Sequence, residues 1–261
     1  MTTERDLART IGTPAWCERT GGRLSFGDKV QTLAQSTVGV AQLSVPWLRW
    51  TLTGWHRPAE PMPEPRGPTS EVCVAAHQLC RDHSPEFMVH HCVRTYSFAR
   101  LLGEHWGIAF DDEVLWISGM LHDIALMDSW EDRRPDEGCF TMPSGRAARR
   151  LCEQAGWSED RVYRAQAAVT LNPSAEVAPE LGIEARLLNL GVMVDAAGLR
   201  LWELHPDDVS RLLERAPRMG MKRKIVGFIH TEADAHPGCR FHFFRRYLRF
   251  ADMARFAPFE S

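Results

Sequence analysis

The stretch Gly119–Leu126, GMLHDIAL, places a histidine and an aspartate side by side inside an otherwise apolar run. A buried aspartate is rare unless it is paired or bound to a cation. Ser118 and Gly119 lie one helical turn beneath His122 and Asp123, and such small residues let a second helix come close. A carboxylate near the negative end of a helix also favours a compensating cation. The doublet therefore predicts a metal site, and an incidental helix-end aspartate is the alternative.

Helical patterns surround this stretch. Ser84-Pro85 is an N-cap followed by a first-turn proline, and it opens a helix to about Glu104. The acidic residues at 111–113 open the next helix, which we expect to end near the HDI triplet. Further helical patterns cover about 28–36, 38–54, 144–155, 158–170, 179–199, 206–216, 219–232 and 239–252. Because we find no sustained β alternation and no internal repeat, the sequence predicts an all-α fold.

Two adjacent histidines occupy the helix that begins at Ser84, and only one of them can face inward. The stripe at i+4, i+7 and i+11 from His91 is the more apolar one, with Thr95, Phe98 and Leu102. We therefore expect His91 to face the core and His90 to face away from it. Arg94 lies one turn further on, as a neighbour of His91. A core histidine satisfied by a single hydrogen bond is the alternative to a metal ligand.

A single acid, Asp195, lies within the long apolar run ARLLNLGVMVDAAGLRLW. An unpaired charge there would be costly to bury, so the side chain needs a cationic partner. Arg94 or another arginine is one candidate partner. The other is a metal ion, in a site that Asp195 completes together with His91, His122 and Asp123.

The order of these residues on successive helices resembles that of the HD-domain superfamily of metal-dependent phosphohydrolases and related enzymes. HCVRTYSFA, LHDI and VDAAG are similar to its first helix, its His-Asp doublet and its last aspartate. The resemblance implies an HD-domain helical bundle with an N-terminal helical extension. It also implies four metal ligands, which are His91, His122, Asp123 and Asp195.

A finer resemblance is to the cyanamide hydratase branch of that superfamily. EADAHPGCRFHFF is similar to a proline-cysteine-histidine tail found there, which implies that Cys239 and His242 line the pocket or its lid. Thr141 stands where that branch commonly has an acid, and Thr170 stands near the place of a histidine. These two departures remove candidate proton-transfer groups and leave Thr141 and Thr170 as candidate pocket residues.

The same C-terminal segment offers a rival set of zinc ligands by residue type. These are His230, His236, Cys239 and His242. Their spacing lacks the regularity of a zinc finger, and ordinary surface and core positions are the alternative.

The resemblance implies one divalent ion, with Zn²⁺ first and Fe²⁺ or Mn²⁺ as alternatives. Such an ion lowers the pKa of bound water and supplies hydroxide near neutral pH. Asp123 would take the proton of that water, and Arg94 would orient a metal-binding carboxylate. These roles make Asp123 and Arg94 the candidate catalytic residues.

Three functions are compatible with this site. The leading one is a hydrolase or hydratase in which metal-bound hydroxide attacks a small molecule, for instance a nitrile such as cyanamide. The second is a nucleotide or phosphate-ester phosphohydrolase, which needs several lysines or arginines at the metal, whereas only Arg94 is credibly placed. The third is a non-catalytic metal-binding regulatory module.

Composition and sequence patterns indicate which partners and which cellular compartment to expect for the protein. The 261 residues carry a formal net charge of −3, which gives no reason to expect nucleic acid as a partner. Seven scattered cysteines and an N-terminus without a signal-peptide core favour the cytoplasm. The most membrane-like stretch, residues 36–55, is interrupted by Gln42, Pro46 and Arg49, so we expect a helix on the core rather than a membrane span. A small-molecule substrate is the expected partner, and a homo-oligomer remains open.

Five prolines in residues 55–69, WHRPAEPMPEPRGPT, indicate a linker. The sequence therefore divides into an N-terminal helical extension with a proline-rich linker, 1–68, and an HD domain with a C-terminal helical tail, 69–261.

Overall fold

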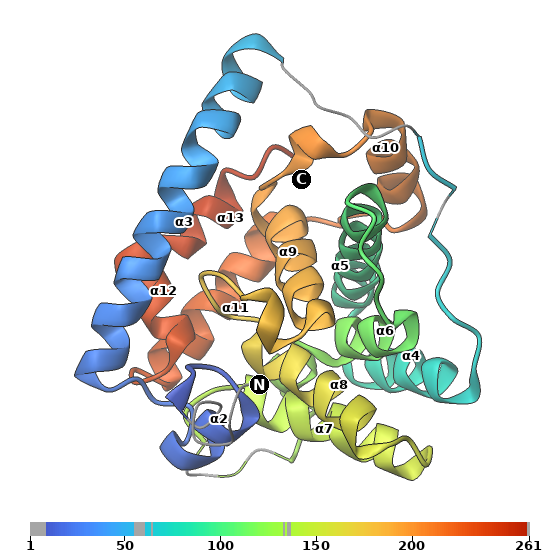
Figure 1. The fold of residues 1–261 in the computed structure, drawn as a ribbon, viewed down its shortest axis with the longest axis vertical. Coiled ribbons are helices and arrows are strands. Elements are labelled where there is room, and N and C mark those ends of the chain that lie inside the picture. Colours follow the sequence, from blue (N-terminus) through green and yellow to red (C-terminus); the bar gives the residue numbers. More distant parts are fainter. Residues whose placement is uncertain (1–8, 55–60, 64, 133, 135–136, 260–261) are drawn as a thin grey trace.

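The all-α prediction is confirmed by the computed structural model, which describes residues 9–54, 61–63, 65–132, 134 and 137–259 (Figure 1). Within these ranges the α-helices are α2 Pro14–Thr20, α3 Phe26–Thr53, α4 Glu71–His83, α5 Glu86–His105, α6 Asp112–Leu121, α7 Thr141–Gln154, α8 Glu159–Leu171, α9 Ile183–Ala197, α10 Pro206–Arg215, α11 Met221–Ala235, α12 Arg240–Leu248 and α13 Phe250–Arg255. Short 3₁₀ turns occupy Ile124–Leu126, Pro179–Leu181 and Leu201–Glu203. Among the described residues, no helix is long and apolar enough to cross a membrane.

Several predicted helices have different bounds in the structure, and the predicted helix 179–199 is a 3₁₀ turn, Pro179–Leu181, followed by α9. Residues 28–36 and 38–54 belong to one helix, α3, which continues through Pro46 and ends at Gly54 in a left-handed conformation. The predicted helix 239–252 is two helices, because Arg249 adopts a left-handed backbone with φ of 54° between them. The linker prediction lies partly outside the described residues, and the division of the chain at residue 68 stays a prediction.

The centre of the bundle is held by close helix contacts at glycines. Helix α5 packs against α9, where a Cβ on Gly191 would lie 2.2 Å from the backbone oxygen of Thr95. Helix α6 crosses the other side of α5, where a Cβ on Gly119 would lie 3.2 Å from the Cβ of Tyr96. Larger side chains at these positions would push apart the helices that carry His91, His122 and Asp195.

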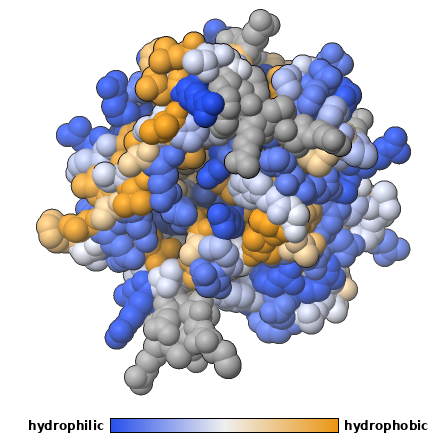
Figure 2. Space-filling model, turned by 45° about the horizontal axis from the view of Figure 1, so that its top comes forward, coloured by the Kyte–Doolittle hydropathy of each residue, from blue (hydrophilic) through white to orange (hydrophobic). Residues whose placement is uncertain are grey.

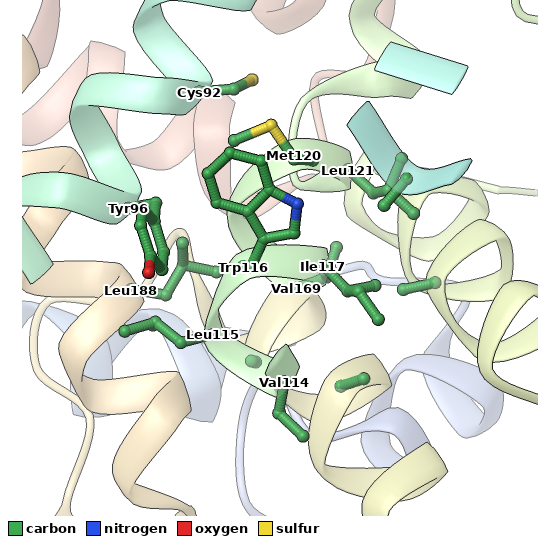
Figure 3. Close-up of a cluster of buried hydrophobic side chains, with 14 of the residues drawn as sticks. Cys92, Tyr96, Val114, Leu115, Trp116, Ile117, Met120, Leu121, Val169 and Leu188 are labelled. Atoms are coloured by element: carbon green, nitrogen blue, oxygen red, sulfur yellow. The ribbon is translucent and has the colours of Figure 1, made fainter. Parts of the chain in front are cut away.

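A large apolar cluster fixes α6 in this arrangement (Figure 3). Tyr96 of α5 packs edge-on against Trp116 of α6, with ring centroids 4.8 Å apart. Leu115, Ile117 and Met120 are fully buried around them. Because burial of each such side chain contributes about 1.5–3 kcal/mol, this cluster stabilises the end of α6 that carries the His-Asp doublet.

Helix α3 runs along the outside of the bundle, beside the C-terminal helices (Figure 1). Its Trp50 contacts Trp202, with ring centroids 6.1 Å apart, so the N-terminal extension packs on the rest of the protein. Hydrophobic side chains gather on the left side in Figure 2, where α3 runs in Figure 1. The exposed large hydrophobic residues of α3 are Phe26, Val30, Leu33, Val38, Val40, Val45, Trp47, Leu48 and Leu52.

Candidate metal centre

The structure brings together three of the four predicted ligands, namely His91, His122 and Asp123. His91 comes from the middle of α5, whereas His122 and Asp123 follow the last residue of α6. All three side chains are buried. The two adjacent histidines face different sides of α5, as the apolar stripe predicts, because His91 is buried and His90 is only half-buried. The Nδ1 atom of His90 lies 3.1 Å from the carbonyl oxygen of Pro217.

Each imidazole makes a hydrogen bond through one ring nitrogen, and this bond determines which nitrogen faces the other residues of the His91, His122 and Asp123 cluster. His91 Nδ1 lies 2.6 Å from Asp195 Oδ2, and His122 Nδ1 lies 2.8 Å from the carbonyl oxygen of Gly119. Both partners are acceptors, so both Nδ1 atoms carry the proton. In the neutral imidazoles each Nε2 therefore presents a lone pair toward Asp123, as a metal-ligating histidine does.

The three inward atoms fit a metal ion. The Nε2 atoms of His91 and His122 are 3.3 Å apart, and Asp123 Oδ2 lies 3.5 and 3.3 Å from them. Tetrahedral ligands at bonds of about 2.0–2.1 Å would be about 3.3–3.4 Å apart. Two lone pairs and a carboxylate oxygen at these separations repel one another unless a cation or a proton lies between them. The donor set and its spacing are therefore those of a divalent-metal site.

The fourth predicted ligand, Asp195, does not converge with the three inward atoms in this structure, and its ligand role stays a prediction. It lies on the opposite side of the His91 ring, where it accepts the Nδ1 proton. Its oxygens also accept hydrogen bonds from Arg94 Nε at 2.7 Å and from an Arg218 terminal nitrogen at 2.8 Å. The alternative partner, an arginine, is therefore the one that the structure shows, and a second arginine joins it.

The predicted catalytic role of Arg94 also changes. Its guanidinium is completely buried and is used by Asp195 and by the carbonyl oxygens of Ala216 and Pro217. It therefore orients a carboxylate, as expected, but that carboxylate acts through His91 and does not lie among the inward ligand atoms. Arg94 is a positioning residue.

Charges around the site shift its pKa values in opposite directions. Burial raises the pKa of Asp195, but Arg94, His91 and Arg218 outweigh burial and hold that pKa far below its ordinary value. His122 and His91 do the same for Asp123, also against burial. For His91, burial lowers the pKa, but Asp123 and Asp195 raise it above the ordinary value. Both carboxylates are therefore ionised at neutral pH, and the metal-free site favours a proton on His91.

A cavity of about 160 Å³ reaches the site, and His91 and Asp123 form part of its wall. Its other lining residues are Ser36, Gly39, Val40, Leu43, Leu126, Phe140, Asn172, Pro173, Ser174, Ala175, Asn189, Val192, Met193, Ala196, Leu199, Ile225, Phe228, Phe241, Phe244, Leu248, Phe250 and Met253. No lysine or arginine of the described chain is among them. The wall combines helices from both ends of the sequence, α3 included.

The four candidate pocket residues do not line this cavity. Thr141 is buried and lies 3.3 Å from a terminal nitrogen of Arg240, and the hydroxyl of Thr170 is 3.4 Å from the Ala167 carbonyl oxygen. Cys239 is the buried N-cap of α12, and His242 Nδ1 lies 2.8 Å from the carbonyl oxygen of Ala233. Their neighbours Phe140 and Phe241 face the cavity instead, because adjacent residues point in different directions.

The rival zinc set does not form among the described residues, where one metal-compatible cluster is found. His242 is held by Ala233, as described above, and His230 Nδ1 lies 3.2 Å from an Arg245 nitrogen. His236 lies 3.9 Å from a carboxylate oxygen of Glu232, so these side chains do not converge.

Sequence reasoning missed Arg218 and the cavity wall. Arg218 follows α10 in an irregular segment, where no periodicity relates it to Asp195. In the sequence, the apolar residues of the cavity wall look like ordinary core residues. Only the three-dimensional structure shows which of them line the cavity.

Residues 88–216 match the family model of the HD domain. This part of the chain is similar to HD domains. This match covers α5 to α10, so it includes the metal-compatible triad as well as Asp195. HD domains are found in a superfamily of metal-dependent hydrolases, which agrees with the buried His-His-Asp cluster. No curated protein matches the chain.

Protons should compete with the metal at this site. Because the pKa of His91 is raised in the metal-free protein, its protonation stabilises that form fully below about pH 6.5 and ceases to do so as the pH rises through the raised pKa. We therefore expect metal affinity, and the gain in melting temperature on adding metal, to increase from about pH 6 to pH 8. Calorimetric metal titrations in buffers of different ionisation enthalpy should show proton release. Equal affinity and no proton release across this range would contradict the arrangement.

Proposed function

We propose that this protein is a metal-dependent hydrolase or hydratase that adds water to an electrophilic carbon of a small neutral molecule, a nitrile such as cyanamide being one example. One observation carries the proposal: two residues of the metal-compatible triad, His91 and Asp123, form part of the wall of a cavity that has no lysine or arginine among its described lining residues. The coarser assignment to metal-dependent hydrolases follows from the similarity to HD domains.

In this proposal His91, His122 and Asp123 hold the ion, most plainly Zn²⁺, with Fe²⁺ and Mn²⁺ as alternatives. A divalent ion bound there would lower the pKa of water toward neutrality. Asp195 keeps the proton on His91 Nδ1, so that Nε2 stays available as a ligand. Arg94 and Arg218 keep Asp195 ionised and immobile.

Asp123 is the proposed proton acceptor, because it is the one acid in the described cavity wall. In this role it would take a proton from the attacking water and pass it to the nitrogen of the substrate. For a nitrile, addition of water to carbon with this proton transfer gives the amide, and for cyanamide it gives urea.

A phosphohydrolase is less well supported. Phosphoryl transfer depends on cationic groups around the transferred phosphate. The two arginines nearest the site, Arg94 and Arg218, are both committed to Asp195. A non-catalytic module would not need a cavity at the metal site.

Metal analysis combined with a substrate screen tests the proposal. We expect about one transition metal per chain and turnover of cyanamide or another nitrile above that of nucleotides and phosphate esters. Asp123→Ala should remove most of the metal and the activity, since it deletes one of three convergent ligand atoms. Preferential hydrolysis of phosphate esters, or full metal content in Asp123→Ala, would overturn it.

A further inference from the structure

The wall of the cavity at the metal site is almost entirely apolar. It includes five phenylalanines: Phe140, Phe228, Phe241, Phe244 and Phe250. Phe241 packs edge-on against both Phe140 and Phe250, with ring centroids 5.2 and 5.8 Å apart, so three of these rings support one another. Beyond His91, Asp123 is the only ionisable residue among the described lining residues. A charged group on a ligand would find no other ionisable side chain in this wall to pair with, so its burial would be costly.

The size of the cavity limits the ligand further. Its volume is about 160 Å³. An apolar cavity of about 150 Å³ is large enough to bind benzene. A nucleotide is much larger than this and carries several charges, so it does not suit the cavity in either respect.

We propose that the substrate is an uncharged, mainly apolar molecule of about benzene's size, with one polar reacting group at His91 and Asp123. This inference rests on the proposed function, because it names the substrate class of that site. An aromatic nitrile such as benzonitrile, with benzamide as its product, has these properties and serves as the probe.

Gly39 offers a way to obstruct the cavity without disturbing the fold. It lies in α3 and lines the cavity, and a Cβ built on it meets no atom within 4 Å. Gly227 of α11 is an exposed glycine with equally open surroundings, but it does not line the cavity. Gly39→Phe and Gly227→Phe are therefore a matched pair of test and control variants.

The experiment measures binding of benzonitrile, cyanamide and phenyl phosphate to the full chain by calorimetry. We expect benzonitrile to bind at least about tenfold more tightly than either of the others, because its ring is buried and it adds no charge. Gly39→Phe should weaken benzonitrile binding by at least about tenfold, and Gly227→Phe should leave it within about twofold. Equal or tighter binding of cyanamide or phenyl phosphate would overturn the inference. So would equal benzonitrile binding by both glycine variants.

Binding and turnover separate this inference from the proposed function. Tight benzonitrile binding without turnover of any nitrile supports the inference and counts against the hydratase reaction. Turnover of cyanamide with no preference for an apolar ring supports the reaction and overturns the inference.

Discussion

His91→Ala is expected to lose metal and activity, while the neighbouring variant His90→Ala keeps both. His91 Nε2 lies 3.3 Å from His122 Nε2 and 3.5 Å from Asp123 Oδ2, so its removal leaves two of the three convergent ligand atoms. Metal affinity should fall by more than the roughly 10–100-fold that is typical when a supporting residue is lost. Metal content after dialysis and nitrile turnover measure the effect.

His90 is a matched control because it has the same side chain one position earlier on α5. Its ring is half-buried and contacts the carbonyl oxygen of Pro217, which lies outside the triad. Its replacement should therefore change stability slightly and leave metal content near that of the unchanged protein. Loss of metal in His90→Ala, with retention in His91→Ala, would show that the site is assembled from the other face of α5.

The helices and the helix phases of this protein can be predicted from local patterns. A helical stripe separates His91 from His90 because the period of 3.6 residues assigns one of them to the apolar face. Gly119, one turn beneath Asp123, predicts a close helix contact, and Tyr96 makes that contact. These features depend on residues within a few turns of one another, which is the range over which sequence periodicity carries information.

Partner choice among distant residues cannot be predicted in the same way. The apolar surroundings of Asp195 predict that it needs a cation, but a metal ion and an arginine satisfy that need equally well. Arg218 lies 23 residues further along the chain, beyond α10, and only the fold brings it to Asp195. The same limit applies to the cavity, where one step in helical phase decides whether Phe140 or Thr141 faces the ligand.

The role of the N-terminal extension could not be deduced from composition either. The proline-rich stretch 55–69 predicts a division of the chain, yet α3 on its N-terminal side contributes Gly39, Val40 and Leu43 to the cavity wall. The HD-domain match begins at residue 88, so this part of the wall lies outside it.

Asp195→Asn is expected to destabilise the protein strongly, and the loss should persist after the metal is removed. The substitution keeps the volume but removes the charge that Arg94 and Arg218 share, and all three side chains are buried. Leaving buried charges without a partner typically costs about 3–5 kcal/mol. Metal affinity should also fall by about 10–100-fold, because His91 loses the carboxylate that fixes its Nδ1 proton.

Thermal melts with and without chelator distinguish this role from that of a metal ligand. If Asp195 were a metal ligand, the metal-free variant would tolerate the substitution. In the metal-free protein the Asp195 carboxylate would then have no cationic partner to lose. The observed pairing predicts a large loss of stability in both states. Asp208→Asn is the control, because Asp208 is also buried but pairs with Arg211, which is 44% exposed and can turn to solvent. Its replacement should cost no more than about 1 kcal/mol. A metal-free Asp195→Asn protein as stable as the unchanged chain would refute the pairing and return Asp195 to the ligand set.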